Sequence, residues 1–323
     1  MKAAVHDRYG SPSVVRLAEV ETPSAGDHDV LVRVHATTVN RTDCAYRAAK
    51  PFFMRALTGL LRPRRPVLGT EYAGVVAAVG GGVTAFAVGD RVFGYNEGAF
   101  GAHAEYLAVP QDGAIAPMPP DASFEAAACA TEGAHYALAF IRTAGVRAGQ
   151  DVLVHGATGA IGSAAVQLLK HRGAAVTAVC ATAHLDLVKG LGADRVVDYT
   201  AQDFTADERR YDAVFDAVGK STFARCKRLL KPGGAYLSSE PGPGAQNLLL
   251  SLVTPLLRGR TVRFPVPRQD QEMVRHFADL LGSGAFKPLI DRRYPLDRIP
   301  DAYRYVETGT KTGNVVITVV AEG

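Results

Sequence analysis

The chain has 323 residues, of which 47% are hydrophobic and 21% are charged, and its formal net charge is +4. These values are typical of a soluble globular protein with two domains, since a domain usually has about 100–200 residues. The sequence has no basic stripe with interleaved aromatic side chains, which a nucleic-acid-binding protein needs, and no run of roughly 18 apolar residues, which a membrane span needs.

The first part of the chain, residues 1–122, is predicted to form short strands. Apolar β-like runs occur at 30–39, 72–80, 90–95 and 104–110, and turns containing Gly or Pro separate them. Closely spaced strands of this kind are typical of a β-barrel or sandwich rather than of alternating strands and helices.

The middle part, residues 123–266, is predicted to alternate between strands and helices. It opens with a helix over 123–145, with Ser123 as N-cap and Gly145 at its end. Strands are then expected at 151–156, 175–180, 195–199, 211–219 and 235–240, with helices at 161–173, 184–192 and 223–234. Apolar strands separated by helices indicate a parallel sheet covered on both faces.

The last part, residues 267–323, is predicted to contain helices at 270–284 and 299–309 and a final strand at 314–320. The whole chain is therefore predicted to be an α/β protein. Its first domain is discontinuous, made of 1–122 and 267–323, and a parallel-sheet domain of 123–266 is inserted into it.

The stretch at 152–170, VLVHGATGAIGSAAVQLLK, combines a strand, a glycine-containing turn and a helix. This is the context that a dinucleotide fingerprint requires, although an ordinary tight turn is the alternative. Gly159 lets the backbone approach a pyrophosphate, Gly162 lets the helix pack close to the strand, and the helix N-terminus favours phosphate. The predicted cofactor contacts in this stretch are Thr158, Gly159, Ala160 and Ile161.

The type of nucleotide is predicted from the end of the next strand, 175–180. No Asp or Glu follows that strand to bind the ribose 2′-hydroxyl of NAD, and Thr182 and His184 stand there instead. The missing carboxylate favours NADPH, because a 2′-phosphate would meet no repulsion. NADH stays the alternative, since no Arg or Lys is present, and His184 is equally consistent with a surface residue.

Three further cofactor contacts are predicted where later strands end: Tyr199, Val218 and Ser238. The carboxyl ends of the strands in an open α/β sheet form the ligand crevice. A structural role is the alternative for Tyr199, and for Asp216 of the same crevice a structural role and a binding role explain the residue equally well.

Seven stretches together resemble the medium-chain dehydrogenase/reductase superfamily. They are GSPSVVRLAEVETP, GTEYAGVVAAVG, VGDRVFG, GATGAIGSAAVQL, LGADRVVDY, FDAVG and TGNVVI. Within that superfamily the chain is similar to the zinc-independent quinone oxidoreductase-like and enone reductase branch. The resemblance implies a GroES-like domain over 1–122 and 267–323 and a Rossmann domain over 123–266, and Asn314 in TGNVVI completes the predicted cofactor contacts.

The resemblance also implies where a catalytic zinc would bind in the alcohol dehydrogenases of the superfamily. Asn40, Thr70 and Ala130 stand where those enzymes have Cys, His and Cys, and Cys129 lies one residue away. Only Glu71 remains as a ligand, whereas a catalytic zinc takes three protein ligands. No catalytic metal is therefore predicted.

Without a metal, the predicted reaction is the reduction of a conjugated carbonyl or quinone, because hydrogen bonds can stabilise the negative charge that spreads onto the oxygen. The predicted catalytic residues are Asn40, which the resemblance implies lies near the nicotinamide, with Thr42 and Tyr46. A pocket-wall role is the alternative for Tyr46. Glu71 is expected to bond the backbone or to pair with Arg47.

Partners and location are predicted from the remaining features. The stretch 50–66 is apolar and basic, and the stretch 241–257 is apolar. Both favour a small hydrophobic carbonyl or quinone substrate, with 50–66 as a lid or, alternatively, a membrane-surface helix. The stretch 260–267 resembles the last strand of the superfamily's cofactor domain, and this resemblance implies that it pairs across a two-fold axis in a homodimer. Four scattered cysteines and the lack of a signal peptide in the first residues predict a cytoplasmic protein without stable membrane insertion.

Two rival functions stay open at this point. One is an NADP-dependent alcohol dehydrogenase with a divergent zinc site. The other is a nucleotide-binding protein without turnover, such as a redox sensor.

Overall fold

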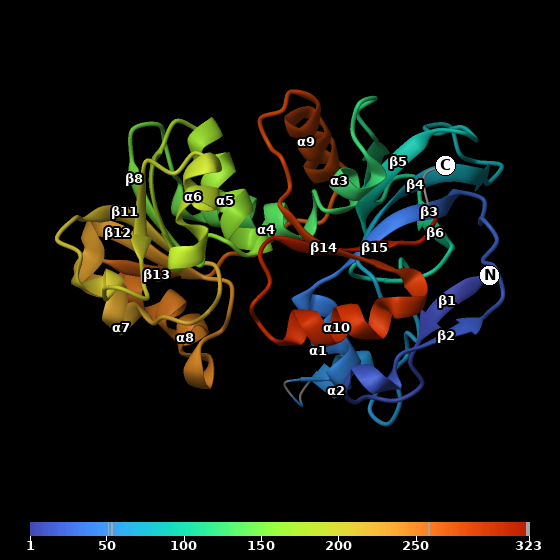
Figure 1. Cartoon of the computed structure of the whole chain (residues 1–323), viewed down its shortest axis with the longest axis horizontal. Coiled ribbons are helices and arrows are strands. Elements are labelled where there is room, and N and C mark those ends of the chain that lie inside the picture. The colour runs from blue at the N-terminus through green and yellow to red at the C-terminus, as the bar shows by residue number, and fades with distance from the viewer. Residues whose placement is uncertain (51, 53, 258, 321–323) are drawn as a thin grey trace. The chain divides into compact units, whose positions relative to one another are not determined.

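The computed structural model describes residues 1–50, 52, 54–257 and 259–320 and divides the chain into two compact units (Figure 1). Unit 1 comprises Met1–Glu132 and Gln269–Gly323, and unit 2 comprises Gly133–Arg268. The predicted divisions were 122/123 and 266/267. The first differs because α3 (Phe124–Ala128) packs against β3 (Asp29–Val39) and β4 (Glu71–Val79) of unit 1.

Unit 1 is built on a seven-stranded sheet of described residues. β6 pairs with β3, and the other strands follow the order β14-β15-β3-β4-β5-β7. Their bounds are β5 (Arg91–Tyr95), β6 (Tyr106–Pro110), β7 (Ile115–Pro117), β14 (Ile290–Pro295) and β15 (Asn314–Thr318). β15 runs antiparallel to β3, with Val315 opposite Val39, so the C-terminal segment completes the sheet of the N-terminal one. A separate hairpin pairs β1 (Lys2–Val5) with β2 (Arg16–Glu19).

The core of unit 1 follows from the period of its apolar residues. In β3, Val30, Val32 and Val34 alternate with less buried residues and pack inward, as a half-buried strand requires. In α10 (Ile299–Glu307), Ile299 and Tyr303 fall on one helical face and pack with β15. The other α-helices of this unit are α1 (Arg41–Ala48), α2 (Met54–Thr58) and α9 (Gln271–Gly282).

Unit 2 has a six-stranded parallel sheet of order β10-β9-β8-β11-β12-β13. The strands are β8 (Asp151–His155), β9 (Ala175–Cys180), β10 (Arg195–Asp198), β11 (Tyr211–Asp216), β12 (Leu230–Ser238) and β13 (Thr261–Arg263). The helices that accompany them are α4 (Glu132–Ala144), α5 (Ala160–His171), α6 (Leu185–Gly190), α7 (Phe223–Cys226) and α8 (Gln246–Val253). This strand order is that of a doubly wound dinucleotide-binding sheet, which confirms the predicted fold class.

Two predicted helices were wrong in extent. The helix expected over 123–145 is interrupted between α3 and α4, because the N–H groups of Thr131 and Glu132 donate to the Glu71 side chain. The helix expected over 223–234 ends early, because Leu230 is buried and already pairs with Tyr211 as the first residue of β12.

Every helix in the described part of the chain is too short or too polar to cross a membrane. The four cysteines are free thiols.

Candidate functional site

The Asn40 side chain is fixed at both ends in unit 1. Its oxygen accepts a hydrogen bond from the Asp43 N–H at 2.9 Å, and the Asp43 carboxylate accepts one from the Asn40 N–H at 3.1 Å. This reciprocal capping box starts α1. The Asn40 amide nitrogen donates to the Thr70 hydroxyl at 2.7 Å. The orientation of the amide is therefore set by the start of α1 and by the residue that directly precedes β4.

The bond between Asn40 and Thr70 bears on the question of a metal. These two residues occupy the positions predicted to have lost a Cys and a His ligand, and Ala130 at the third position is a buried methyl group. An amide, a hydroxyl and a methyl group are not the ligands that zinc takes. Among the described residues, no group of three or more His, Cys, Asp or Glu side chains could hold a metal ion. The residues present do not fit a catalytic zinc.

Glu71, the one predicted remaining ligand, is fully buried and has its oxygens occupied by donors. Oε1 accepts from the Thr131 N–H at 3.2 Å, the Thr131 hydroxyl at 2.9 Å and the Glu132 N–H at 2.6 Å, and Oε2 accepts from the Thr38 hydroxyl at 2.5 Å. Burial raises the pKa of Glu71, and these bonds oppose that shift. The alternative pairing with Arg47 was wrong, because Arg47 forms an ion pair with Glu307.

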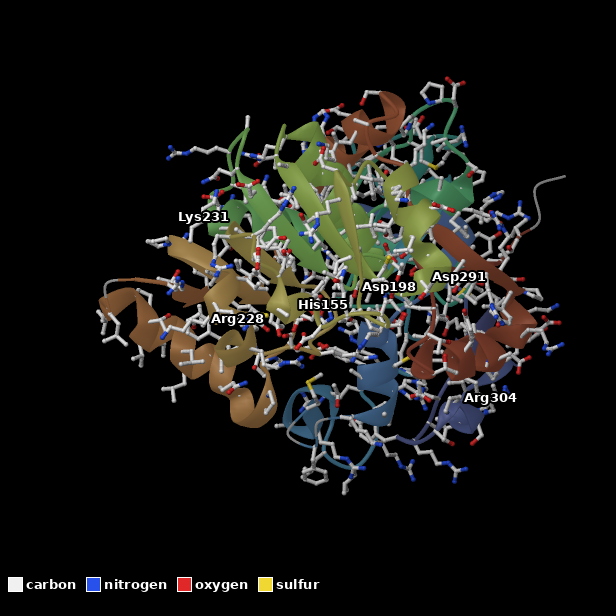
Figure 2. All side chains as sticks on the ribbon, turned by 60° about the vertical axis from the view of Figure 1, so that its left-hand side comes forward. His155, Asp198, Arg228, Lys231, Asp291 and Arg304 are labelled. Atoms are coloured by element: carbon white, nitrogen blue, oxygen red, sulfur yellow. The ribbon has the colours of Figure 1, made fainter. Side chains whose placement is uncertain are left out.

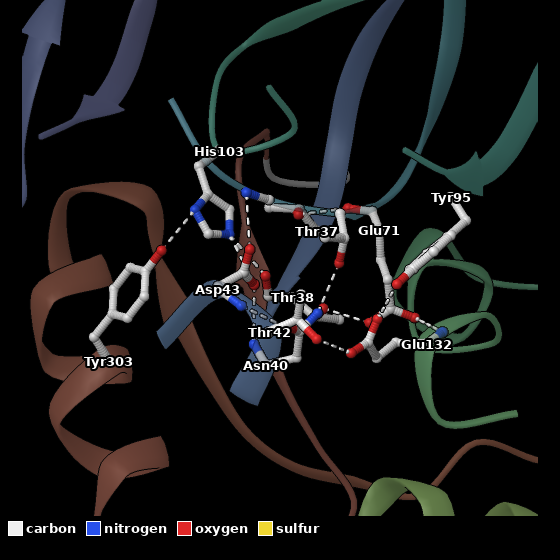
Figure 3. A network of polar contacts seen from close by, with 12 residues as sticks. Thr37, Thr38, Asn40, Thr42, Asp43, Glu71, Tyr95, His103, Glu132 and Tyr303 are labelled. Atoms are coloured by element: carbon white, nitrogen blue, oxygen red, sulfur yellow. Dashed lines mark hydrogen bonds and ion pairs between the residues drawn. The ribbon is translucent and has the colours of Figure 1, made fainter. Parts of the chain in front are cut away.

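A chain of hydrogen bonds runs from Thr42 through Glu132 to Tyr95 (Figure 3). The Thr42 hydroxyl lies 2.7 Å from Glu132 Oε1, and the Tyr95 hydroxyl lies 2.5 Å from Glu132 Oε2. Burial, followed by the nearby charge of Glu71, raises the pKa of Glu132 well above its usual value. Sequence reasoning placed Glu132 on a helix without a role. The signal available was a polar Thr-Glu pair inside an alanine-rich apolar run.

A second arm of the same network supports the start of α1 (Figure 3). His103 Nε2 donates to the Thr38 carbonyl at 2.8 Å, and the Tyr303 hydroxyl lies 3.3 Å from His103 Nδ1. Burial lowers the pKa of His103 to about 4, so the ring is neutral at physiological pH. Asp43 Oδ1 accepts from the Gly69 N–H at 3.0 Å, which ties the first turn of α1 to the residues before β4.

Tyr46 lies one turn after Thr42 on α1 and lines a cavity of about 400 Å³ within unit 1. Its ring packs against Phe100 at 4.6 Å between centroids, and Glu97 lines the same cavity. The stretch predicted as a lid, 50–66, contributes Thr58, Pro63, Arg64 and Arg65 to the lining, and positions 51 and 53 lie outside the described residues. Arg64 and Arg65 make this part of the wall basic, in keeping with the basic residues of the stretch.

The glycine turn of unit 2 leaves space where a phosphate is predicted. A Cβ atom added to Gly162 would lie 2.1 Å from the Gly156 carbonyl oxygen, so α5 packs directly on the turn. A Cβ atom added to Gly159 would meet nothing closer than 3.8 Å. The first turn of α5 contains no acidic residue, and no side chain caps it. The first N–H groups of a helix have no partner within the helix, and beside open space they fit a pyrophosphate, with Thr158, Ala160 and Ile161 flanking it.

An acid stands beside Thr182, where the sequence predicted none. Asp198 ends β10 opposite Cys180, the last residue of β9. Its carboxylate accepts from the hydroxyls of Thr182 and Thr200, both at 2.6 Å, and these bonds hold its pKa below the usual value. No acid follows β9 itself, but the neighbouring parallel strand β10 supplies this one. His184 ends the 3₁₀ turn Thr182–His184, and Tyr199 next to Asp198 is exposed.

His155 is the last residue of β8, and Asp198 is the last residue of β10, so both lie at the carboxyl ends of the parallel strands (Figure 2). Its Nδ1 lies 3.0 Å from Asp216, whose other oxygen accepts from the Ser221 N–H at 2.8 Å and the Tyr236 hydroxyl at 3.0 Å. This buried set of bonds fixes the carboxyl ends of β8 and β11 next to the glycine turn.

The remaining predicted cofactor contacts fall in different places. Val218 packs against the glycine turn, since a Cβ atom at Gly156 would lie 2.3 Å from its side chain. Ser238 is buried at the end of β12 and accepts from the Glu240 N–H at 3.2 Å. Asn314 belongs to unit 1, where its amide donates to the Leu289 carbonyl at 3.1 Å, so the structure does not group it with the others.

Comparisons with known proteins agree across nearly the whole chain. Residues 26–120 match the alcohol dehydrogenase GroES-like domain, and residues 191–317 match the family described as zinc-binding dehydrogenase. The chain is 34% identical to the 2-methylene-furan-3-one reductase of Solanum lycopersicum, and the match covers 98% of this chain and 79% of the relative. It is 33% identical to the chloroplastic NADPH-dependent alkenal/one oxidoreductase of Arabidopsis thaliana, with the same coverage.

Comparison with a solved structure shows the same fold over nearly the whole chain. The quinone oxidoreductase from Coxiella burnetii matches with a TM-score of 0.89 and 27% identity over 99% of each chain.

Proposed function

Because the chain belongs to the quinone oxidoreductase-like branch of the medium-chain dehydrogenase/reductase superfamily, we propose that this enzyme uses NADPH to reduce a quinone or an α,β-unsaturated carbonyl compound. The observation that carries the proposal is the hydrogen-bonded pair of Asn40 and Thr70, at the positions where zinc dehydrogenases have ligands. The pair offers hydrogen-bond donors rather than a Lewis acid. Donors of this kind suffice when negative charge spreads over a conjugated oxygen.

The glycine turn and the start of α5 support a dinucleotide site in unit 2. The N–H groups of Ala160 and Ile161 would hold the pyrophosphate, with Gly159 providing room for it. His184 and Tyr199 would lie at the 2′-phosphate end, and the NADPH-dependent relative favours NADPH over NADH. When bound, NADPH supplies the hydride.

Asn40 is the residue that we place at the substrate oxygen. One N–H of its amide is used by Thr70, and an amide nitrogen carries two. The second N–H would donate to the carbonyl oxygen as negative charge develops there. The cap on α1 and the bond to Thr70 hold this donor in place before the substrate arrives, so little reorganisation is needed during the reaction.

A screen of substrates tests the proposal. Purified protein is given NADPH with 2-alkenals, cyclic enones and quinones, and oxidation is followed at 340 nm. We expect turnover with at least one conjugated class, no oxidation of simple alcohols with NADP, and no stoichiometric zinc by elemental analysis. Alcohol oxidation that depends on bound zinc would support the dehydrogenase alternative, and NADPH binding without turnover would support a non-catalytic role.

We further propose that the protein forms a homodimer through the edge of the sheet in unit 2. β13 pairs only with β12 among the described strands, and α8, which contacts β13, exposes Leu249 and Leu252 by 65% and 73%. Exposed leucines beside an unpaired strand edge favour association.

A further inference from the structure

One hydroxyl group in unit 1 lies between two carboxyl groups. The Tyr95 hydroxyl oxygen is 2.5 Å from Glu132 Oε2 and 2.9 Å from Glu97 Oε2. A phenol carries one proton and donates it to one acceptor at a time. The other short contact is therefore a hydrogen bond only if that carboxyl group carries a proton of its own.

The surroundings of the two carboxyl groups show which one holds this proton. Glu97 Oε2 also receives the side-chain N–H of Gln269 at 2.6 Å, so this oxygen acts as an acceptor. The side-chain partners of Glu132 are the hydroxyls of Thr42 and Tyr95, and a hydroxyl accepts as readily as it donates. Glu132 is 6% exposed, and burial favours the neutral form of a carboxyl group. Burial therefore favours Glu132, rather than Glu97, as the carboxyl group that carries the proton, and in that form it can donate to either of its two hydroxyl neighbours.

We propose that four side chains form a proton relay from the cavity of unit 1 to the reduced substrate: Glu97, Tyr95, Glu132 and Thr42. Its two ends are partly exposed, with Glu97 lining the cavity of about 400 Å³ and Thr42 in the first turn of α1, two residues after Asn40. Its two middle members, Tyr95 and Glu132, are 3% and 6% exposed. A path whose ends are partly exposed and whose middle residues are buried can transfer protons while it excludes water from its centre.

The relay supplies the proton that the proposed reaction needs, so this inference rests on the proposed function. A hydride brings two electrons and one hydrogen to the β-carbon of an enone and leaves an enolate, which takes one proton at the α-carbon. Thr42 gives its hydroxyl proton to the α-carbon and takes the proton of Glu132. Tyr95 then passes its proton to Glu132 and regains one from water through Glu97. The sum is enone, NADPH and H⁺ giving the saturated ketone and NADP⁺.

The face of protonation tests the relay. In D₂O, wild-type protein should reduce 2-methylcyclohex-2-enone to a product that carries α-deuterium with one configuration in clear excess. In Tyr95→Phe, Glu132→Gln and Thr42→Val the enolate should be protonated by solvent instead, so the two configurations approach equal amounts. We also expect kcat to fall by about 10²-fold, the usual scale of a lost general acid, while the Kd for NADPH stays unchanged.

Two matched variants separate the relay from a merely structural effect. Tyr305→Phe removes a tyrosine hydroxyl that lies 2.7 Å from Asp291 in the same unit, and it should keep the wild-type configuration. Thr42→Ser keeps a hydroxyl group at the delivering end and should keep it too.

The relay is overturned if Tyr95→Phe and Thr42→Val retain the wild-type excess, or if wild-type protein itself gives equal amounts. These two variants decide the matter even if Glu132→Gln does not fold. Failure of wild-type protein to reduce any enone or quinone would instead overturn the proposed function, and the relay with it.

Discussion

At the scale of single residues, Asn40 serves two separable purposes. Its oxygen caps α1, and its nitrogen bonds Thr70 and is proposed to contact the substrate. A substitution that keeps an oxygen at the cap but removes the amide nitrogen therefore distinguishes folding from catalysis.

Asn40→Ser should retain the cap, because a serine oxygen also accepts from the N–H of Asp43. Asn40→Ala should lower the free energy of unfolding by about 1 kcal/mol through the lost cap. Both variants should lose about 10²-fold in kcat with an enone, the usual scale of a lost oxyanion donor. Urea unfolding and NADPH oxidation measure the two effects, and a fully active Asn40→Ser would remove Asn40 from the catalytic set.

Asp198 should limit the preference for NADPH, because its carboxylate stands beside Thr182 at the predicted 2′-phosphate end. Asp198→Asn should lower the Kd for NADPH several-fold and leave the Kd for NADH nearly unchanged, as measured by fluorescence titration. Asp194→Asn is the control, since Asp194 directly precedes β10 at its opposite end and pairs with Lys170. Weaker NADPH binding by Asp198→Asn would place the 2′-phosphate elsewhere.

Asp216 should make the protein less stable in acid. Burial alone would raise the pKa of this carboxyl group, but the bonds from His155, Ser221 and Tyr236 outweigh burial and hold the pKa below its usual value. A carboxyl group with a lowered folded-state pKa binds fewer protons when folded, so its stabilising effect is full above its unfolded pKa and is lost as pH falls through the folded value.

The corresponding variant is Asp216→Asn. Between pH 5 and pH 3, the free energy of unfolding should fall less in this variant than in wild-type protein, as measured by urea denaturation. Equal slopes in the two proteins would contradict the assignment.

At the scale of secondary-structure elements, the sequence predicted the strands and helices whose extent depends on their own residues and is not changed by a distant side chain. The alternation in 30–39 and the helical period in 299–309 were sufficient, because each places one apolar face on the core. The break between α3 and α4 was not predictable from local pattern, since Glu71, some sixty positions earlier, takes the N–H groups that would continue the helix.

The site was predictable to the same extent. The family resemblance supplied Asn40 and Thr42 as candidates, and a motif of a few adjacent residues supplied the glycine turn. Tyr95 and Asp198 were not among the predicted residues, because each gains its proposed role only through a partner on another strand or helix.

The turn before α5 offers a matched pair of glycine substitutions. Gly162→Ala should destabilise unit 2, because its new methyl group would lie 2.1 Å from a backbone oxygen that cannot move away. Gly159→Ala should leave the free energy of unfolding within about 0.5 kcal/mol of wild type, because the space there is open. The same Gly159→Ala should raise the Kd for NADPH at least tenfold if the pyrophosphate occupies that space.

Thermal unfolding and NADPH titration of both glycine variants check these expectations. Unchanged NADPH binding in a folded Gly159→Ala protein would show that the pyrophosphate does not approach this residue.

At the scale of the whole molecule, the exposed leucines of α8 predict the oligomeric state. The double variant Leu249→Lys with Leu252→Lys should sediment as a monomer at a concentration where wild-type protein is a dimer, because the charges cannot be buried in an interface. Val88→Lys, at an exposed position of unit 1, should leave the dimer intact. A monomeric wild type, or a dimeric double variant, would contradict the proposed interface.

The contact between the Asn40 amide and the Thr70 hydroxyl also has a consequence for protein engineering, because it occupies two of the three positions that a zinc site in this scaffold would need. Replacing these two side chains by cysteine and histidine would still leave a methyl group at Ala130, so zinc would have only two new ligands. The change at Asn40 would also remove the side-chain oxygen that caps α1. A designer would have to install all three ligands at once, which means that small sequence changes do not readily restore metal dependence.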